Sequence, residues 1–188
     1  MLRREGEVLG FALDEAPTFG EPRWSSTLVR TALDRGDIDE ANAVLGRPFV
    51  LRGDVEHGDA RGRDLGYATA NIALAPHQAI PQIGIYAGAA RIADGTWHAA
   101  AISVGTRPQF YEHAVVLVEV HLPDFSGDLY GQVLDVAFLA RLRPEMTFAD
   151  VEALVAQIGV DVEQTREIFK KFSPSQSVLL ELITGQRR

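Results

Sequence analysis

The sequence predicts a mainly β domain, built as an antiparallel barrel or sandwich, with helices on either side of it. Between residues 85 and 139, β-branched and apolar residues gather in several runs of strand length. Turn signals separate these runs, and no long helical pattern falls between them, which argues against a sheet of alternating strands and helices. Before residue 46 and after residue 147, apolar residues recur at helical spacing instead.

The N-terminal zone, residues 1–46, begins irregularly and then predicts two short helices. Residues 25–27 (Ser-Ser-Thr) offer an N-cap, and apolar residues follow at helical spacing as far as Gly36. Asp37 is expected to cap the second helix, because Glu40 three residues later completes a capping box. Gly46 is expected to end it.

Four strands are expected at residues 85–92, 96–104, 115–122 and 133–139. The segments between them carry Gly, Pro, Asp and Ser in turn combinations, at residues 94–95, 105–108 and 126–128. After them, one apolar helical face continues beyond Gly159, and its members are Phe148, Val151, Leu154, Val155, Ile158, Val162, Thr165, Ile168, Phe169 and Phe172. Residues 173–188 show no clear pattern.

Composition and charge disfavour several classes of protein. The chain has 26 acidic against 18 basic residues and a formal net charge of −8, so it should repel a nucleic-acid backbone. No apolar run reaches membrane-spanning length, and a cytoplasmic location fits best. Without cysteine the chain has no thiolate metal ligand, and its histidines lack zinc-ligand spacing.

The densest chemical signal is a glycine-rich segment at residues 53–66. Its glycines would let the backbone approach a ligand and point N–H groups at phosphate oxygens, and two arginines would add charge. The candidate phosphate-binding residues are Gly58, Arg61, Gly62, Arg63 and Gly66. A flexible hairpin connection explains the same composition, and from spacing alone it is the better explanation.

Two further segments carry oxygen ligands and a candidate base. If the chain is extended after the glycine segment, Thr69 and Asn71 project to one side and offer oxygens that suit magnesium, although such residues often only bond a local turn. Glu119 and His121 share one face of a predicted strand whose other face is apolar. Glu119 could serve as a base there, or simply face solvent.

A third segment precedes the last helix. It contains Arg143, Glu145 and Phe148, and an aromatic ring beside Arg and Glu can line a pocket for a flat ring. Packing and helix capping are the more common roles of such residues.

Taken in order, these motifs resemble the riboflavin kinase domain of bacterial bifunctional FAD synthetases. The likeness covers roughly residues 45–161. It rests on Gly-x-Val-x-x-Gly-x-x-x-Gly-Arg-x-Leu-Gly from Gly53, Thr69-Ala70-Asn71, Gly84-Ile85-Tyr86, residues 105–108 (Gly-Thr-Arg-Pro), Glu119-x-His121, Asp128-Leu129-Tyr130-Gly131 and Leu142-Arg143-Pro144-Glu145.

The resemblance implies a six-stranded antiparallel, Greek-key-like barrel with a C-terminal helix, which phosphorylates riboflavin with ATP to give FMN and ADP. If the roles of the family's residues apply at the matching positions here, Thr69 and Asn71 would hold Mg²⁺. The loop from residue 58 to 66 would close over the phosphates. Glu119 would accept the proton of the ribityl hydroxyl, and Arg143 with the start of the last helix would border the isoalloxazine.

The resemblance also suggests a division of the chain. Residues 25–30 (Ser-Ser-Thr-Leu-Val-Arg) are similar to the end of the adenylyltransferase domain in those enzymes, so residues 1–46 are expected to be its remnant. Residues 47–172 would form the kinase barrel and helix, with 173–188 as a tail. The rest of the adenylyltransferase domain is missing, so the chain is not expected to make FAD by itself.

Three positions depart from the family pattern. Ala68 stands where the family has proline, Ser103 where it has asparagine, and Gln109 where it has threonine. Proline would fix φ, so Ala68 leaves the metal-binding strand less preset. These departures keep two alternatives open: a non-catalytic flavin- or nucleotide-binding paralogue, and a kinase for a flavin analogue.

Overall fold

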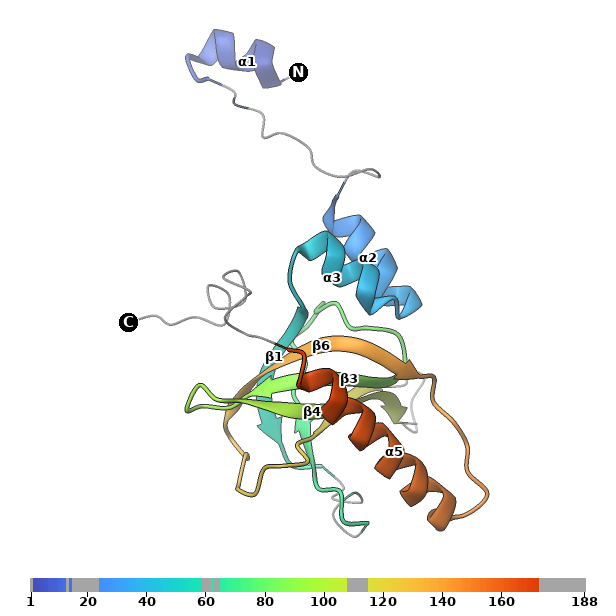
Figure 1. Ribbon diagram of the computed structural model, residues 1–188. Helices are drawn as coiled ribbons and strands as arrows, with labels where there is room; N and C mark the ends of the chain where they lie inside the picture. The colour runs from blue at the N-terminus through green and yellow to red at the C-terminus, as the bar shows by residue number, and fades with distance from the viewer. Residues whose placement is uncertain are drawn as a thin grey trace.

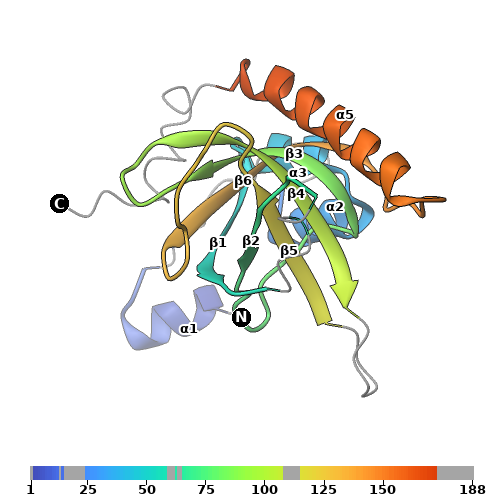
Figure 2. The ribbon, with the colours of Figure 1, turned by 90° about the horizontal axis from the view of Figure 1, so that it is seen from below.

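A closed antiparallel barrel of six strands forms the centre of the molecule. The computed structural model describes residues 2–12, 14, 24–58, 62, 65–107 and 115–172. The strands pair in the order β1-β2-β5-β4-β3-β6, and β6 returns to β1 (Figures 1 and 2). Their bounds are β1 (Phe49–Glu56), β2 (Thr69–Ile72), β3 (Gly84–Arg91), β4 (Trp97–Arg107), β5 (Val115–His121) and β6 (Val133–Arg143). The predicted mainly β class and barrel are therefore confirmed.

Alternation along the strands separates the core from the outer surface. On β2, Ala70 and Ile72 are buried, and on β5, Val118 and Val120 are buried. Because successive side chains of a strand point to opposite faces, the residues between them lie on the outside of the barrel. Thr69 and Asn71 thus project to one side of β2, as predicted, and Glu119 shares the outer face of β5 with His121.

Helix α5 (Val151–Phe169) lies across the outside of β3, β4 and β6 (Figure 2). Alanines on the outer faces of these strands are completely buried, among them Ala87, Ala89 and Ala137. Small side chains let the helix approach the sheet closely, which explains why β3 is buried on both faces. At its end, the Phe172 ring meets Trp97 of β4 edge-on, with centroids 5.5 Å apart.

The helices α2 (Ser26–Arg35) and α3 (Ile38–Leu45) pack at one end of the barrel (Figure 1). Leu33 and Ile38 are 1% exposed and belong to the same core cluster as the barrel interior. The Asn42 side chain joins helix to sheet, because it donates to the Phe138 carbonyl at 3.0 Å and accepts from the Phe49 N–H at 2.7 Å. Residues on both sides of position 46 therefore share one core.

The predicted N-caps form, but the Glu40 half of the predicted capping box does not, because the Asp37 N–H donates to the Ala32 carbonyl and the Glu40 carboxylate pairs with Arg35. Ser25 accepts from the N–H of Leu28 at the start of α2, and Asp37 accepts from the N–H of Glu40 at the start of α3. Gly36 and Gly46 end these helices with φ of 72° and 65°.

The structure corrects the sequence predictions at several places. Residues 2–9, taken as irregular, form helix α1 (Leu2–Leu9). Residues 53–56, assigned to the glycine-rich loop, belong to β1, and residues 105–107, assigned to a turn, continue β4. Val151 is 54% exposed, so it does not share the packed face of α5. Among the described residues, no helix is both long enough and apolar enough to cross a membrane.

Gly159 provides a test of the packing of α5. It lies inside the helix, and a Cβ there would meet the Tyr67 hydroxyl oxygen at 3.5 Å, an ordinary contact. Gly159→Ala is therefore expected to raise the free energy of unfolding by about 0.5–1 kcal/mol, measured by urea denaturation. Gly46→Ala is the matched control with opposite sign, because its φ of 65° costs a Cβ about 1–2 kcal/mol. A destabilised Gly159→Ala protein would contradict this packing.

Candidate active site

The β2–β5 ladder brings together the predicted base and both predicted magnesium ligands. Asn71 lies opposite Glu119 in the register, and Thr69 lies opposite His121. All four side chains project from the outer face of the barrel. The Thr69 hydroxyl donates across the ladder to Oε1 of Glu119 at 3.3 Å. Antiparallel pairing therefore joins residues fifty positions apart in the sequence into one polar group.

Glu119 faces a cavity of about 400 Å³ between the barrel and α5, which we call the Glu119 cavity. Its walls are largely apolar, and polar groups enter from a few sides only. This combination is typical of a site for a ring-bearing small molecule. The lining residues are Gly62, Tyr67, Thr69, Ile85, Ala101, Ile102, Ser103, Glu119, His121, Arg143, Glu145, Met146, Phe148, Leu154, Ile158 and Asp161.

The three residues predicted to border a flat ring all line the Glu119 cavity. The Arg143 guanidinium lies 5.8 Å from the centre of the Phe148 ring. Glu145 lies across from β4, since its Oε1 would be 3.2 Å from a Cβ at Gly105. The structure therefore brings Arg143, Glu145 and Phe148 to the same cavity as Glu119.

Arg143 is held by a buried carboxylate that the sequence reading missed. Its Nη2 donates to Oδ2 of Asp161 at 2.7 Å, and its Nε contacts both carboxylate oxygens at 3.1 Å. Gln157 donates to Oδ1 of Asp161 at 2.9 Å. The side chains of Arg143 and Asp161 are 14% and 3% exposed, so this pair ties α5 to the end of β6 away from water.

A second cavity of about 420 Å³ opens on the other side of Thr69, and we call it the Tyr130 cavity. It lies between β1, β2, β5 and the segment that follows β5. Thr69 lines both cavities and is therefore part of a wall that they share, whereas Glu119 lines only the Glu119 cavity. The lining residues are Val55, Ala68, Thr69, Ala70, Val120, Leu122, Phe125, Gly127, Asp128, Leu129 and Tyr130.

The glycine-rich segment approaches these residues from outside the barrel. Gly58 lies against the Asn71 carboxamide, where a Cβ would come within 2.0 Å of Nδ2. Gly62 packs on the Tyr67 carbonyl and lines the Glu119 cavity. Gly66 has a φ of 85°, a left-handed conformation that favours glycine. The predicted phosphate contacts Arg61 and Arg63 lie outside the described residues.

Gly58 leads to a kinetic prediction. The Cβ of Gly58→Ala would displace the Asn71 carboxamide, and if Asn71 has the predicted role of a magnesium ligand, a misplacement of about 1 Å there costs about 100-fold in rate. We expect kcat to fall by about that factor, with far-ultraviolet circular dichroism unchanged. If the effect acts through Asn71, adding Gly58→Ala to Asn71→Ala should cost little more. Full additivity of the two losses would show that Gly58 acts independently of Asn71.

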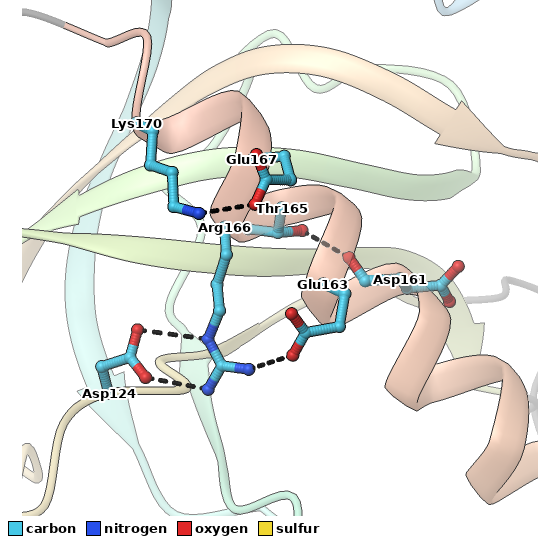
Figure 3. A network of polar contacts seen from close by, with 7 residues as sticks. All are labelled: Asp124, Asp161, Glu163, Thr165, Arg166, Glu167 and Lys170. Atoms are coloured by element: carbon cyan, nitrogen blue, oxygen red, sulfur yellow. Dashed lines mark hydrogen bonds and ion pairs between the residues drawn. The ribbon is translucent and has the colours of Figure 1, made fainter.

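Helix α5 also supports the segment beside the Tyr130 cavity. Arg166 donates to Oδ1 of Asp124 at 2.8 Å and to Oδ2 at 3.3 Å, and it pairs with Glu163 on its own helix (Figure 3). The hydrogen bond from Arg166 lowers the pKa of Asp124. Asp124 precedes Phe125 in the wall of the Tyr130 cavity. One helix thus contacts the Glu119 cavity directly and holds a segment that lines the other.

Among the lining residues with polar side chains, Tyr67, His121 and Asp161 were given no role from the sequence. For His121, the period of the strand was the available signal, since it placed His121 on the face of Glu119. Asp161 offered a weaker signal, as an acid on an otherwise apolar helical face. The local sequence pattern around Tyr67 held no comparable signal.

A family model and a curated relative both match most of this chain. The family model described as riboflavin kinase (Flavokinase) matches residues 45–169. The bifunctional riboflavin kinase/FMN adenylyltransferase of Listeria monocytogenes is 37% identical over 154 residues, which is 82% of this chain and 49% of that protein. The chain therefore spans about half the length of this curated relative.

Solved structures share the fold. The riboflavin kinase from Trypanosoma brucei is 25% identical with a TM-score of 0.52, covering 75% of this chain and 92% of that one. A Streptococcus pneumoniae structure described as a macrolide-efflux protein is 37% identical with a TM-score of 0.73, covering 83% of this chain and 49% of that one.

Proposed function

The chain belongs to the riboflavin kinase family, and we propose that it transfers the γ-phosphate of ATP to the 5′-hydroxyl of riboflavin, giving FMN and ADP. The hydroxyl oxygen forms a bond to the γ-phosphorus, the bond from that phosphorus to the β–γ bridging oxygen breaks, and the hydroxyl proton goes to a base. The proposal covers this transfer alone, because the chain spans about half of the bifunctional relative.

The observation that carries the proposal is the position of Thr69, which lines both cavities and donates a hydrogen bond to Glu119. A transfer between two substrates needs two neighbouring sites with a shared wall, so that the donor phosphate and the acceptor hydroxyl come together in line. We place the flavin in the Glu119 cavity and the nucleotide in the Tyr130 cavity. The apolar wall of the Glu119 cavity suits a flat ring, and its Glu119 end suits a hydroxyl.

Glu119 is proposed as the base that takes the hydroxyl proton. Its Oε1 accepts a hydrogen bond from Thr69, which holds the carboxylate beside the residue that both cavities share. An ionised carboxylate in this position can accept the proton as the new bond to phosphorus forms.

Thr69 and Asn71 are proposed to hold Mg²⁺. Both supply oxygen donors on one face of the barrel next to a carboxylate, and magnesium usually takes only one or two protein ligands beside water and phosphate oxygens. The residues present therefore fit the ion. When bound, it would neutralise charge on the phosphate oxygens. The backbone of the glycine-rich segment, through Gly58, Gly62 and Gly66, is proposed to cover the phosphates.

Arg143, Glu145 and Phe148 are proposed to border the isoalloxazine. The ion pair with Asp161 holds the Arg143 guanidinium at the wall of the Glu119 cavity even when no ligand is bound. A preordered wall reduces the entropy lost on binding, so these residues would favour affinity for the ring rather than the chemical step.

The experiment is to incubate the protein with riboflavin, ATP and Mg²⁺ and to separate the flavins by chromatography. FMN should appear together with ADP and disappear on addition of EDTA, and Glu119→Gln should lower its rate. Riboflavin binding without FMN would support the flavin-binding alternative that Ala68 and Ser103 keep open. Faster turnover of a flavin analogue in competition would support the analogue kinase instead.

A further inference from the structure

His121 lies at the edge of the Glu119 cavity, two residues after Glu119 on the same face of β5. Its Nδ1 lies 2.8 Å from the carbonyl oxygen of Ala68, at the start of β2. Its ring also meets the Tyr67 ring edge-on, with centroids 5.3 Å apart. Two contacts from the neighbouring segment therefore fix the orientation of the imidazole.

The contact with Ala68 also fixes the tautomer of the neutral ring. A carbonyl oxygen only accepts hydrogen bonds, so Nδ1 must carry the proton and donate it. In the neutral imidazole, Nε2 is then a bare acceptor on the side of the ring away from Ala68. No hydrogen bond joins Nε2 to any residue in the described part of the chain.

We propose that His121 is a specificity-determining residue whose Nε2 accepts a hydrogen bond from a secondary hydroxyl of the polyol chain of the substrate. Residues two apart on one strand face are separated by about 7 Å, so a polyol several carbons long can reach both side chains. Its terminal hydroxyl would face Glu119 while an inner hydroxyl bonds His121. The inference rests on the proposed function. It adds a residue that recognises the polyol chain of the substrate rather than its ring.

A purely structural role is the competing explanation, in which His121 only holds the Ala68 carbonyl and the start of β2. Two substitutions separate the roles by geometry. The carboxamide of His121→Asn can replace Nδ1 and keep the bond to Ala68, but it has no atom at the position of Nε2. The longer His121→Gln reaches the position of Nε2 and loses the bond to Ala68.

The test measures dissociation constants of riboflavin and lumiflavin by flavin fluorescence for the full chain and both variants. Lumiflavin carries the ring without the polyol chain. His121→Asn should weaken riboflavin binding about tenfold, because a hydroxyl loses its partner, and should leave lumiflavin binding unchanged. His121→Gln should bind riboflavin more tightly than His121→Asn does.

Several results would overturn the inference. Unchanged riboflavin binding in His121→Asn would do so, as would an equal loss of riboflavin and lumiflavin, since both point to structure. A greater loss in His121→Gln than in His121→Asn would assign the role to the Ala68 contact. Lumiflavin binding also reports folding of each variant. If the unmodified chain forms no FMN, the proposed function is wrong. If it forms FMN and His121→Asn binds riboflavin as tightly as the unmodified chain does, only this inference is wrong.

Discussion

Asn71→Ala and Thr69→Ala are each expected to lower kcat at least as much as Glu119→Gln does. A general base contributes about 10²–10⁴-fold to a proton transfer, which sets the scale of the Glu119→Gln loss. Phosphoryl transfer depends mainly on positioning and charge neutralisation, so losing a ligand of the ion that supplies both should cost as much or more. Thr69→Ala carries a second cost, since Glu119 loses its hydrogen bond.

The dependence on magnesium identifies which role each residue has. Steady-state kcat measured over a range of Mg²⁺ concentrations should show a raised half-saturation point for Asn71→Ala and Thr69→Ala, but not for Glu119→Gln. Thr69→Ser is the matched control, because it keeps the hydroxyl and should retain most of the activity. Near-normal turnover without Thr69 and Asn71, together with an inactive Glu119→Gln protein, would overturn the metal assignment.

The strands of the barrel were predictable where local pattern and long-range pairing agree. The run at residues 115–122 is rich in valine and alternates apolar and polar residues from Val118 onward, and β5 occupies almost the same range. The same period of two predicted that Thr69 and Asn71 share one side of their strand and that Glu119 shares a face with His121, but not that these faces lie outside the barrel.

The prediction was wrong where pairing overrides local propensity. Gly53 reads as a loop residue, yet it lies in β1 opposite Leu134 of β6. A Cβ there would come within 2.2 Å of the Ala73 carbonyl oxygen. Glycine is therefore required at position 53 because another backbone segment lies close to it, and not because the chain turns there. That approach depends on a segment twenty residues away. The residues next to Gly53 in the sequence therefore do not reveal this contact.

The polar contacts of the site were hidden for the same reason. Arg143 was assigned to a ring-binding wall from its neighbours in sequence, but its carboxylate partner stands eighteen residues further along, on α5. The boundary at residue 46 and the roles of the site residues stay predictions. The shared core of α2, α3 and the barrel adds one expectation, that residues before 46 contribute to the stability of the kinase fold.

Asp161→Ala is expected to lower the free energy of unfolding by about 3–5 kcal/mol, measured by urea denaturation. Removing one partner of a buried ion pair leaves the other charge without compensation, and the Arg143 side chain is only 14% exposed in the intact pair. Surface pairs give a contrast within the same helix. Arg166→Met breaks the pair with Asp124, whose carboxylate is 62% exposed, and should lower the free energy of unfolding far less than Asp161→Ala does.

A double substitution separates stability from function at this pair. Arg143→Met with Asp161→Leu replaces both charges by apolar groups, which often restores stability to the level of the original pair or above it. If the double variant is stable but binds riboflavin weakly, the charges serve the flavin wall and their burial is a cost of function. If it binds riboflavin normally, Arg143 only anchors α5, and its assignment to the isoalloxazine is wrong. An Asp161→Ala protein as stable as the unmodified chain would instead show that the pair is hydrated in solution.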